Sequence, residues 1–165
     1  MADPTPLGTA LAALFGELVD GPPGYAYMLN QGDAGLLRSL GQLSAADASR
    51  PSATGGGSVA AHVEHLRYGL SLMNQAAAGE NPFAGADWSA SWRLGTVTDA
   101  EWAARRQALA DEAGRWRLAL ARTPDPEAVS PEMLRGMIGS VAHLAYHLGA
   151  IRQLAPAARG PAAND

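Results

Sequence analysis

The sequence contains no cysteine and no lysine, and its 12 basic residues are all arginines. Without cysteine, the chain can form no disulfide bond and offers neither a thiolate nucleophile nor a cysteine metal ligand. Without lysine, Schiff-base chemistry and a lysine general base are excluded. The formal net charge of -4 also argues against a nucleic-acid-binding protein, because such proteins normally carry a basic face. We therefore expect no nucleic-acid partner.

Long hydrophobic runs are also lacking. No apolar stretch approaches the roughly 18 residues that a membrane-spanning helix requires. The N-terminal stretch MADPTPLGTALAALF has no basic region before its short apolar part, as a signal peptide would have. A hydrophobic content of 47% in 165 residues suits one domain with a substantial core. These features predict a cytoplasmic protein without a membrane partner.

Four segments have the apolar spacing of amphipathic helices: residues 6–19, 58–78, 98–122 and 130–154. Three of them begin with start signals. Ser58 is a predicted N-cap, TDAE at 98–101 is a capping box, and Ser130 is an N-cap followed by proline. The sequence shows no strand-like alternation and no repeat. We therefore predict an all-α protein, with a four-helix bundle over residues 1–155 and a disordered tail over residues 156–165.

The two irregular parts of the chain are harder to interpret. After the helix-ending stretch DGPPG, the stretch DAGLLRSLGQL could form a short helix and SAADAS one capped turn. RPSATGGG is predicted to be a loop, because three successive glycines carry too much backbone entropy for the interior of an element. The stretch AGENPFAGADWSASW forms a long connection with Trp88 and Trp92. We expect these tryptophans to pack the connection onto the bundle, in preference to walling a pocket.

The four histidines fall into two pairs, each on one helix face: His62 with His65, and His143 with His147. A single histidine in such a position most often bonds to a backbone carbonyl. Two neutral imidazoles four residues apart, however, direct two lone pairs to one point, which suits a metal ion. Two ligands bind weakly, so we expect a third from the other pair. Three neutral ligands leave coordination positions open, which is typical of a catalytic site.

Two opposed observations bear on the choice between His62 and His65. At about 100° per residue, His62 lies about 60° from the centre of its helix's apolar stripe and His65 about 120°, so burial favours His62. On the later helix, however, His143 and His147 also lie on the flank of the stripe, among small residues. His65 shares its own flank with Gly69. Small residues there would leave room for a metal and a substrate, and this symmetry favours His65.

The stretches SVAAHVEHL and HLAYHLGAIRQL resemble the DinB/YfiT-like family. The family pattern is a serine-started helix ending in His-Leu, followed by a late helix with His-x-x-x-His-x-Gly. The resemblance implies an up-down-down-up four-helix bundle, commonly a homodimer, with a divalent metal on His65, His143 and His147. It leaves His62 as an outer partner of the site or a fourth ligand. The sequence departs from the pattern at Ala150, where many members have glutamine, so a polar group beside the metal is missing.

The resemblance also implies a chemistry. Family members of known activity are thiol-dependent, such as bacillithiol S-transferases and mycothiol-dependent isomerases. A metal with open positions lowers the pKa of a bound thiol, and a chain without cysteine would need a thiol from a cosubstrate. We therefore expect a metal-dependent enzyme acting on a small-molecule thiol and an electrophile. Zinc and nickel are the expected metals, with iron and manganese as alternatives. The competing interpretations are a metal-dependent hydrolase and a non-catalytic metal-binding or dimerisation module of a stress response.

Other polar residues are weaker candidates. Glu17 and Glu64 could act as general bases, but glutamates on helix surfaces usually face solvent. Arg106 falls near an apolar stripe and could bind a carboxylate, although such an arginine more often lays its apolar stem along the core. The sequence therefore points to the histidines as the candidate functional residues.

Overall fold

Every regular element is helical in the computed structural model, which describes residues 5–53 and 55–162. The α-helices are α1 (Pro6–Asp20), α2 (Gly35–Gly41), α3 (Ala45–Ser49), α4 (Val59–Ala77), α5 (Asp99–Ala121) and α6 (Pro131–Leu154). Short 3-10 turns follow in the connections and the tail: η1 (Phe83–Gly85), η2 (Ala90–Arg93), η3 (Pro126–Ala128) and η4 (Pro156–Ala158). None of these helices is both long enough and apolar enough to cross a membrane.

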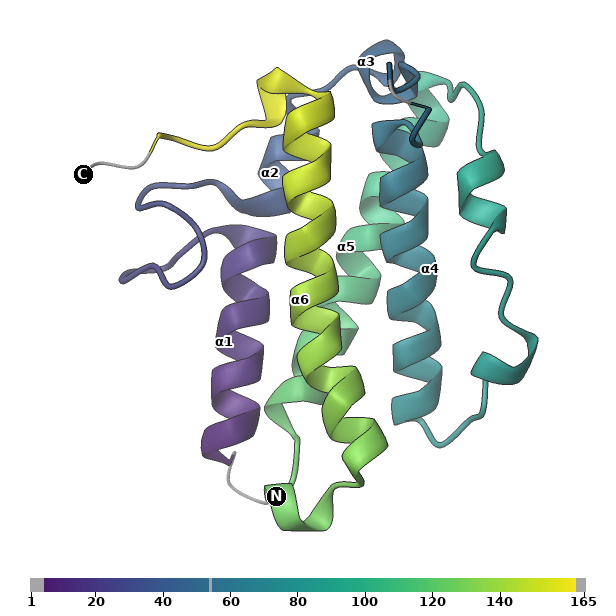
Figure 1. The fold of residues 1–165 in the computed structure, drawn as a ribbon. Helices are drawn as coiled ribbons and strands as arrows, with labels where there is room; N and C mark the ends of the chain where they lie inside the picture. The colour runs from purple at the N-terminus through teal and green to yellow at the C-terminus, as the bar shows by residue number, and fades with distance from the viewer. Residues whose placement is uncertain (1–4, 54, 163–165) are drawn as a thin grey trace.

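The four long helices form a bundle in which each packs on two others (Figure 1). Helix α1 packs on α5 and α6, and α4 packs on the same two helices. In Figure 1, α1 and α6 run upward while α4 and α5 run downward. The predicted all-α helical bundle is therefore confirmed, and its helix directions are those that the resemblance implies. Because unrelated sequences share such bundles, this arrangement by itself does not establish a family.

The helix start signals have the predicted roles. Ser58 accepts a hydrogen bond from the backbone N–H of Ala61, and Ser130 accepts one from the N–H of Met133. The capping box at the start of α5 is complete, with Thr98 as the N-cap. These side chains satisfy backbone N–H groups that have no partner in the first helical turn. The starts of three long helices are therefore determined by local sequence.

The core is built from the predicted apolar stripes. All five predicted inward residues of α5 are buried: Trp102, Leu109, Ala113, Trp116 and Leu120. The stripe of α4 is buried through Leu70, and Met73 is only partly buried. Trp102 also donates its ring N–H to the carbonyl of Leu43 at 2.9 Å, which ties α5 to the segment after α2. The expected short helix in DAGLLRSLGQL is α2, and the expected capped turn in SAADAS is α3, with Ser44 as its N-cap.

Glu17 does not face solvent as surface glutamates usually do. Its residue is only 3% exposed, and its carboxylate accepts hydrogen bonds from the backbone N–H groups of Tyr27, Met28 and Leu29. The shortest of these distances are 2.7 Å. Hydrogen bonds to the charged form of a carboxylate are strong enough to offset its burial. Glu17 therefore organises the segment after α1, and its carboxylate is not available as a general base.

The C-terminal segment also differs from the expectation of a disordered tail from residue 156. Residues 156–158 form η4, which packs on α2 and α6, and Ala158 is 1% exposed. Asn30 donates to the carbonyl of Pro161 at 2.7 Å. Burial and long-range hydrogen bonding therefore fix this segment, although its composition resembles that of a linker. Residues 163–165 of the predicted tail lie outside the described residues.

We predict that Glu17→Ala destabilises the protein by about 1–3 kcal/mol, because buried backbone N–H groups would lose their acceptor. Amide hydrogen exchange at Met28 and Leu29 should accelerate selectively. The measurements are urea unfolding and exchange followed by NMR. Exposed Glu80 provides the matched control, and Glu80→Ala should change stability by less than about 0.5 kcal/mol. Equal effects of the two variants would contradict the role assigned to Glu17.

Candidate metal centre

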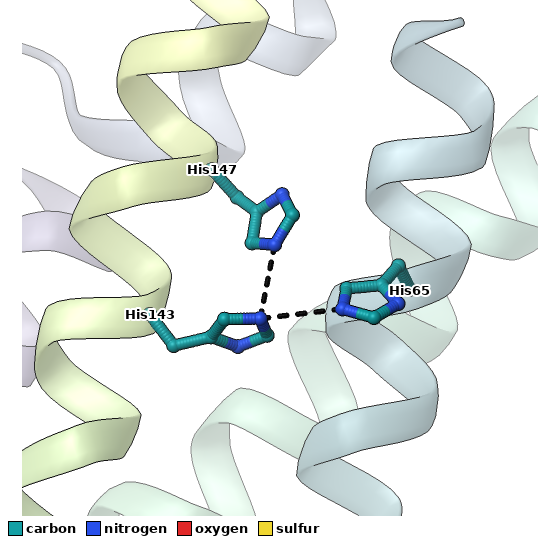
Figure 2. Close-up of side chains that lie close together, drawn as sticks. All are labelled: His65, His143 and His147. Carbon is teal, nitrogen blue, oxygen red and sulfur yellow. Dashed lines mark hydrogen bonds between the residues drawn. The ribbon is translucent and has the colours of Figure 1, made fainter. Parts of the chain in front are cut away.

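Three histidines converge between α4 and α6 (Figure 2). His65 comes from α4, whereas His143 and His147 come from successive turns of α6. The Nε2 atom of His143 lies 3.2 Å from Nε2 of His65 and 2.9 Å from Nε2 of His147. One nitrogen from each ring lies within 4.8 Å of the other two. Two neighbouring helices therefore bring three ring nitrogens to one point.

The spacing of these nitrogens fits a metal site. Ligands about 2.0–2.1 Å from a tetrahedral zinc ion are separated from each other by about 3.3 Å. The observed Nε2 separations of 2.9 and 3.2 Å are close to this value. Hydrogen bonding alone accounts for them poorly. A ring nitrogen carries one proton or one lone pair, so Nε2 of His143 cannot form a full hydrogen bond with both neighbours. A cation among the three nitrogens would engage every lone pair.

The outer nitrogens of two of these rings also have partners. Nδ1 of His65 lies 3.2 Å from the hydroxyl oxygen of Ser91 in η2. Nδ1 of His147 lies 2.8 Å from Nδ1 of His62. Metal-binding histidines characteristically use their second nitrogen for such a contact, which orients the ring. Sequence reasoning missed Ser91, because it lies in an irregular connection and no local pattern marks it.

The structure distinguishes His65 from His62 by position. Their exposures are nearly equal, at 8% and 9%, so burial does not separate them. His65 directs Nε2 toward His143. His62 lies outside the group of three and contacts Nδ1 of His147. The geometry therefore agrees with the flank position and with the family resemblance, both of which favour His65.

Burial keeps the four histidines neutral near pH 7. It lowers the pKa of His62, His65 and His143 below the ordinary value, and the neighbouring imidazoles of His143 and His62 lower that of His65 further. Burial and the three neighbouring imidazoles lower the pKa of His147 to about 3. A neutral imidazole retains a lone pair, which is the form that binds a metal. The electrostatics of the site therefore favour metal binding over proton binding.

Two tryptophans of the connection between α4 and α5 cover the histidines. The ring centroid of Trp92 lies 4.7 Å from that of His65 and 6.0 Å from that of His147, and Trp88 lies 5.9 Å from His65. The predicted packing of this connection onto the bundle is confirmed. The same contacts also make the tryptophans one wall of the histidine cluster. Both side chains remain about 40% exposed, at 41% for Trp88 and 40% for Trp92.

Two glycines provide space for these tryptophans. A Cβ atom at Gly57, the last residue of the glycine run, would lie 2.6 Å from Cε3 of Trp92. A Cβ at Gly69 would lie 3.4 Å from Cζ3 of Trp88. We expected Gly69 to leave room for a metal and a substrate, but its open face is occupied by a tryptophan ring. Gly57, just before α4, and Gly69, within it, therefore shape the wall of the site.

Glu64, the second candidate general base, is engaged in ion pairs. Its carboxylate contacts Arg67 and Arg105 at 2.7 Å each. The three side chains are 19–26% exposed, and Glu64 and Arg105 line, together with Ser91, a cavity of about 310 Å³. Arg106 instead lies over the ring of Trp102, at 5.6 Å from the centroid, as expected of an arginine stem along the core. None of these groups belongs to the histidine cluster.

Comparison of the chain with protein-family models, with curated proteins and with solved structures finds no match. The resemblance to the DinB/YfiT-like family therefore stays a prediction from the histidine motifs.

We predict that the metal-free protein loses stability as the pH falls from about 7.5 to about 5.5. An unfolded chain binds protons at histidine near pH 6.5, whereas the folded state resists this because the pKa of each of these histidines is lowered, to about 3 for His147. The unfolded state then holds more protons, so the stability present above pH 6.5 declines on acidification. Urea unfolding in the presence of a chelator measures this slope.

His147→Gln is the comparison variant for this slope. The variant lacks the imidazole whose pKa is lowered to about 3. The stability of the variant should therefore depend less steeply on pH over the same interval. A wild-type protein whose stability is constant or rises on acidification would contradict the prediction.

Proposed function

We propose that the protein binds one divalent metal ion through Nε2 of His65, His143 and His147. The convergence of three neutral ring nitrogens on one point between α4 and α6 carries this proposal. Two further features support it. The outer nitrogens of His65 and His147 are hydrogen-bonded, and burial lowers the pKa of all three rings. Neutral imidazole nitrogens around one point are better satisfied by a shared metal ion than by hydrogen bonds to one another.

Imidazole ligands suit zinc, nickel and iron, and we propose zinc or nickel as the resident ion. Three protein ligands leave coordination positions for an exogenous molecule, as in catalytic zinc sites. Among the residues that the structure describes, no carboxylate joins these three histidines. This donor set therefore fits a site that binds a further ligand better than a closed structural site.

We predict that untagged wild-type protein contains about one zinc or nickel ion per chain, as expected for one ligand set of this kind. His147→Ala should abolish stoichiometric binding, because a third of the ligands is lost, and His65→Ala and His143→Ala should act alike. Elemental analysis and metal titration of the refolded apoprotein measure occupancy. Gln153→Ala, at an exposed position on the same helix, is the control and should retain full occupancy. Full occupancy in His147→Ala would refute the ligand assignment.

We further propose that the centre serves a thiol-dependent transfer or isomerisation, as the resemblance to the DinB/YfiT-like family implies. Membership of this family and a homodimeric state belong to the same proposal. A divalent ion supplies one property, the acidification of a thiol or water molecule that reaches it. The three histidines hold that ion, and the exposed faces of Trp88 and Trp92 offer an apolar surface beside it. The chain has no thiol of its own, so the nucleophilic sulfur must come from a cosubstrate.

A model reaction tests this chemistry. We predict that metal-loaded protein accelerates the reaction in which a low-molecular-weight thiol replaces the chloride of chlorodinitrobenzene. In this reaction a carbon–sulfur bond forms, the carbon–chlorine bond breaks with release of chloride, and the thiol proton passes to the buffer. The rate is followed by absorbance across a panel of thiols, and it should require both the thiol and His147. Gln153→Ala is again the control and should react like the wild type.

Other outcomes would favour the alternatives. Ester or amide hydrolysis without thiol would favour a metal-dependent hydrolase. Stoichiometric metal binding without turnover of any thiol or ester would favour the non-catalytic metal-binding module.

A further inference from the structure

His62 contacts the candidate ligand His147 at Nδ1, the ring nitrogen that does not face His143. Its Nδ1 atom lies 2.8 Å from Nδ1 of His147, and the two rings meet edge to face with centroids 5.0 Å apart. Trp92 packs edge-on against His62 at 5.1 Å. His62 is 9% exposed. The contact is therefore a short, buried hydrogen bond between two imidazoles.

The position of one proton determines the direction of this hydrogen bond. Two Nδ1 atoms at 2.8 Å share a single proton, so one ring donates and the other accepts. His147 directs Nε2 toward His143, and a metal ligand must present a lone pair there. A neutral imidazole has one proton, so His147 then carries it on Nδ1. His62 must accept at Nδ1 and keep its own proton on Nε2.

We propose that His62 is a positioning residue, which accepts the Nδ1 proton of His147 and so fixes the tautomer and ring orientation of that ligand. This inference rests on the metal site of the proposed function. It also answers whether His62 is a fourth ligand: its Nδ1 atom is engaged with His147, and its ring lies outside the group of three. Ser91 has the corresponding position at His65, where its hydroxyl lies 3.2 Å from Nδ1.

Three variants test the acceptor at residue 62. His62→Leu fills the space of the ring but offers no hydrogen-bond acceptor, and His62→Ala removes both the ring volume and the acceptor. His62→Asn places an amide oxygen near the former Nδ1. Loss of such an outer partner typically weakens metal binding about 10- to 100-fold. We expect this loss for leucine and alanine, with asparagine restoring affinity to within about threefold of the wild type. Zinc affinity is measured by competition with a chromophoric chelator near neutral pH.

Tyr146 provides the matched control for these variants. Its ring, 71% exposed, meets His147 edge-on at a centroid distance of 5.1 Å. Tyr146→Leu should leave zinc affinity nearly unchanged, because it removes a ring contact without removing the acceptor. Circular dichroism establishes that each variant is folded. Equal zinc affinity in His62→Leu and the wild type, or failure of asparagine to restore the loss, would overturn the positioning role.

NMR of the wild-type protein tests the proton position directly, even if a variant fails to fold. Nitrogen-15 spectra of the imidazole rings should show His147 protonated at Nδ1 and His62 protonated at Nε2, with and without zinc. A proton on Nε2 of His147, or zinc bound at its Nδ1, would overturn the inference. Wild-type protein that binds no metal would instead refute the proposed function and the positioning role with it. Unchanged zinc affinity in His62→Leu would refute the role of His62 alone.

Discussion

The packing of α4 against α6 is the contact on which the candidate site depends. The two helices run in opposite directions (Figure 1), and both contribute to the hydrophobic core, α4 with Val63 and Leu66 and α6 with Leu144 and Leu148. The histidines lie beside these apolar residues on the same helices. Each buried aliphatic side chain contributes roughly 1.5–3 kcal/mol, so the apolar contact holds the imidazoles together without requiring a metal. The site is therefore supported by the core.

The features that sequence predicted correctly depend on local interactions. Helix starts at Ser58, Thr98 and Ser130 need only a side-chain acceptor within the first turn. The inward stripes follow from the helical period, and so does the shared face of His143 and His147. The third histidine required a further step, because burial and flank position favoured different residues. The flank position indicated His65, and in the structure Nε2 of His65 lies close to Nε2 of His143.

The features that sequence missed depend on contacts between distant segments. Glu17 binds backbone N–H groups ten to twelve residues away, in a segment without regular structure. Ser91 contacts His65 from the irregular connection after α4, in which Trp92 packs close to Gly57. The segment around Ala158 is ordered by α2 and α6, not by its own composition. Such contacts leave no periodic signal, so hydrophobic patterning cannot find them.

The outer partners of the histidine cluster have a consequence for charge balance. In many metal sites a carboxylate accepts the second proton of a histidine ligand. Here the partners are a neutral imidazole and a hydroxyl, and Glu64, the one acidic residue of α4, is neutralised by two arginines. A divalent ion held at this point would therefore keep both of its positive charges. An anionic ligand from outside the chain would be the natural counterion, so the metal-bound cluster would favour ligands that bind as anions.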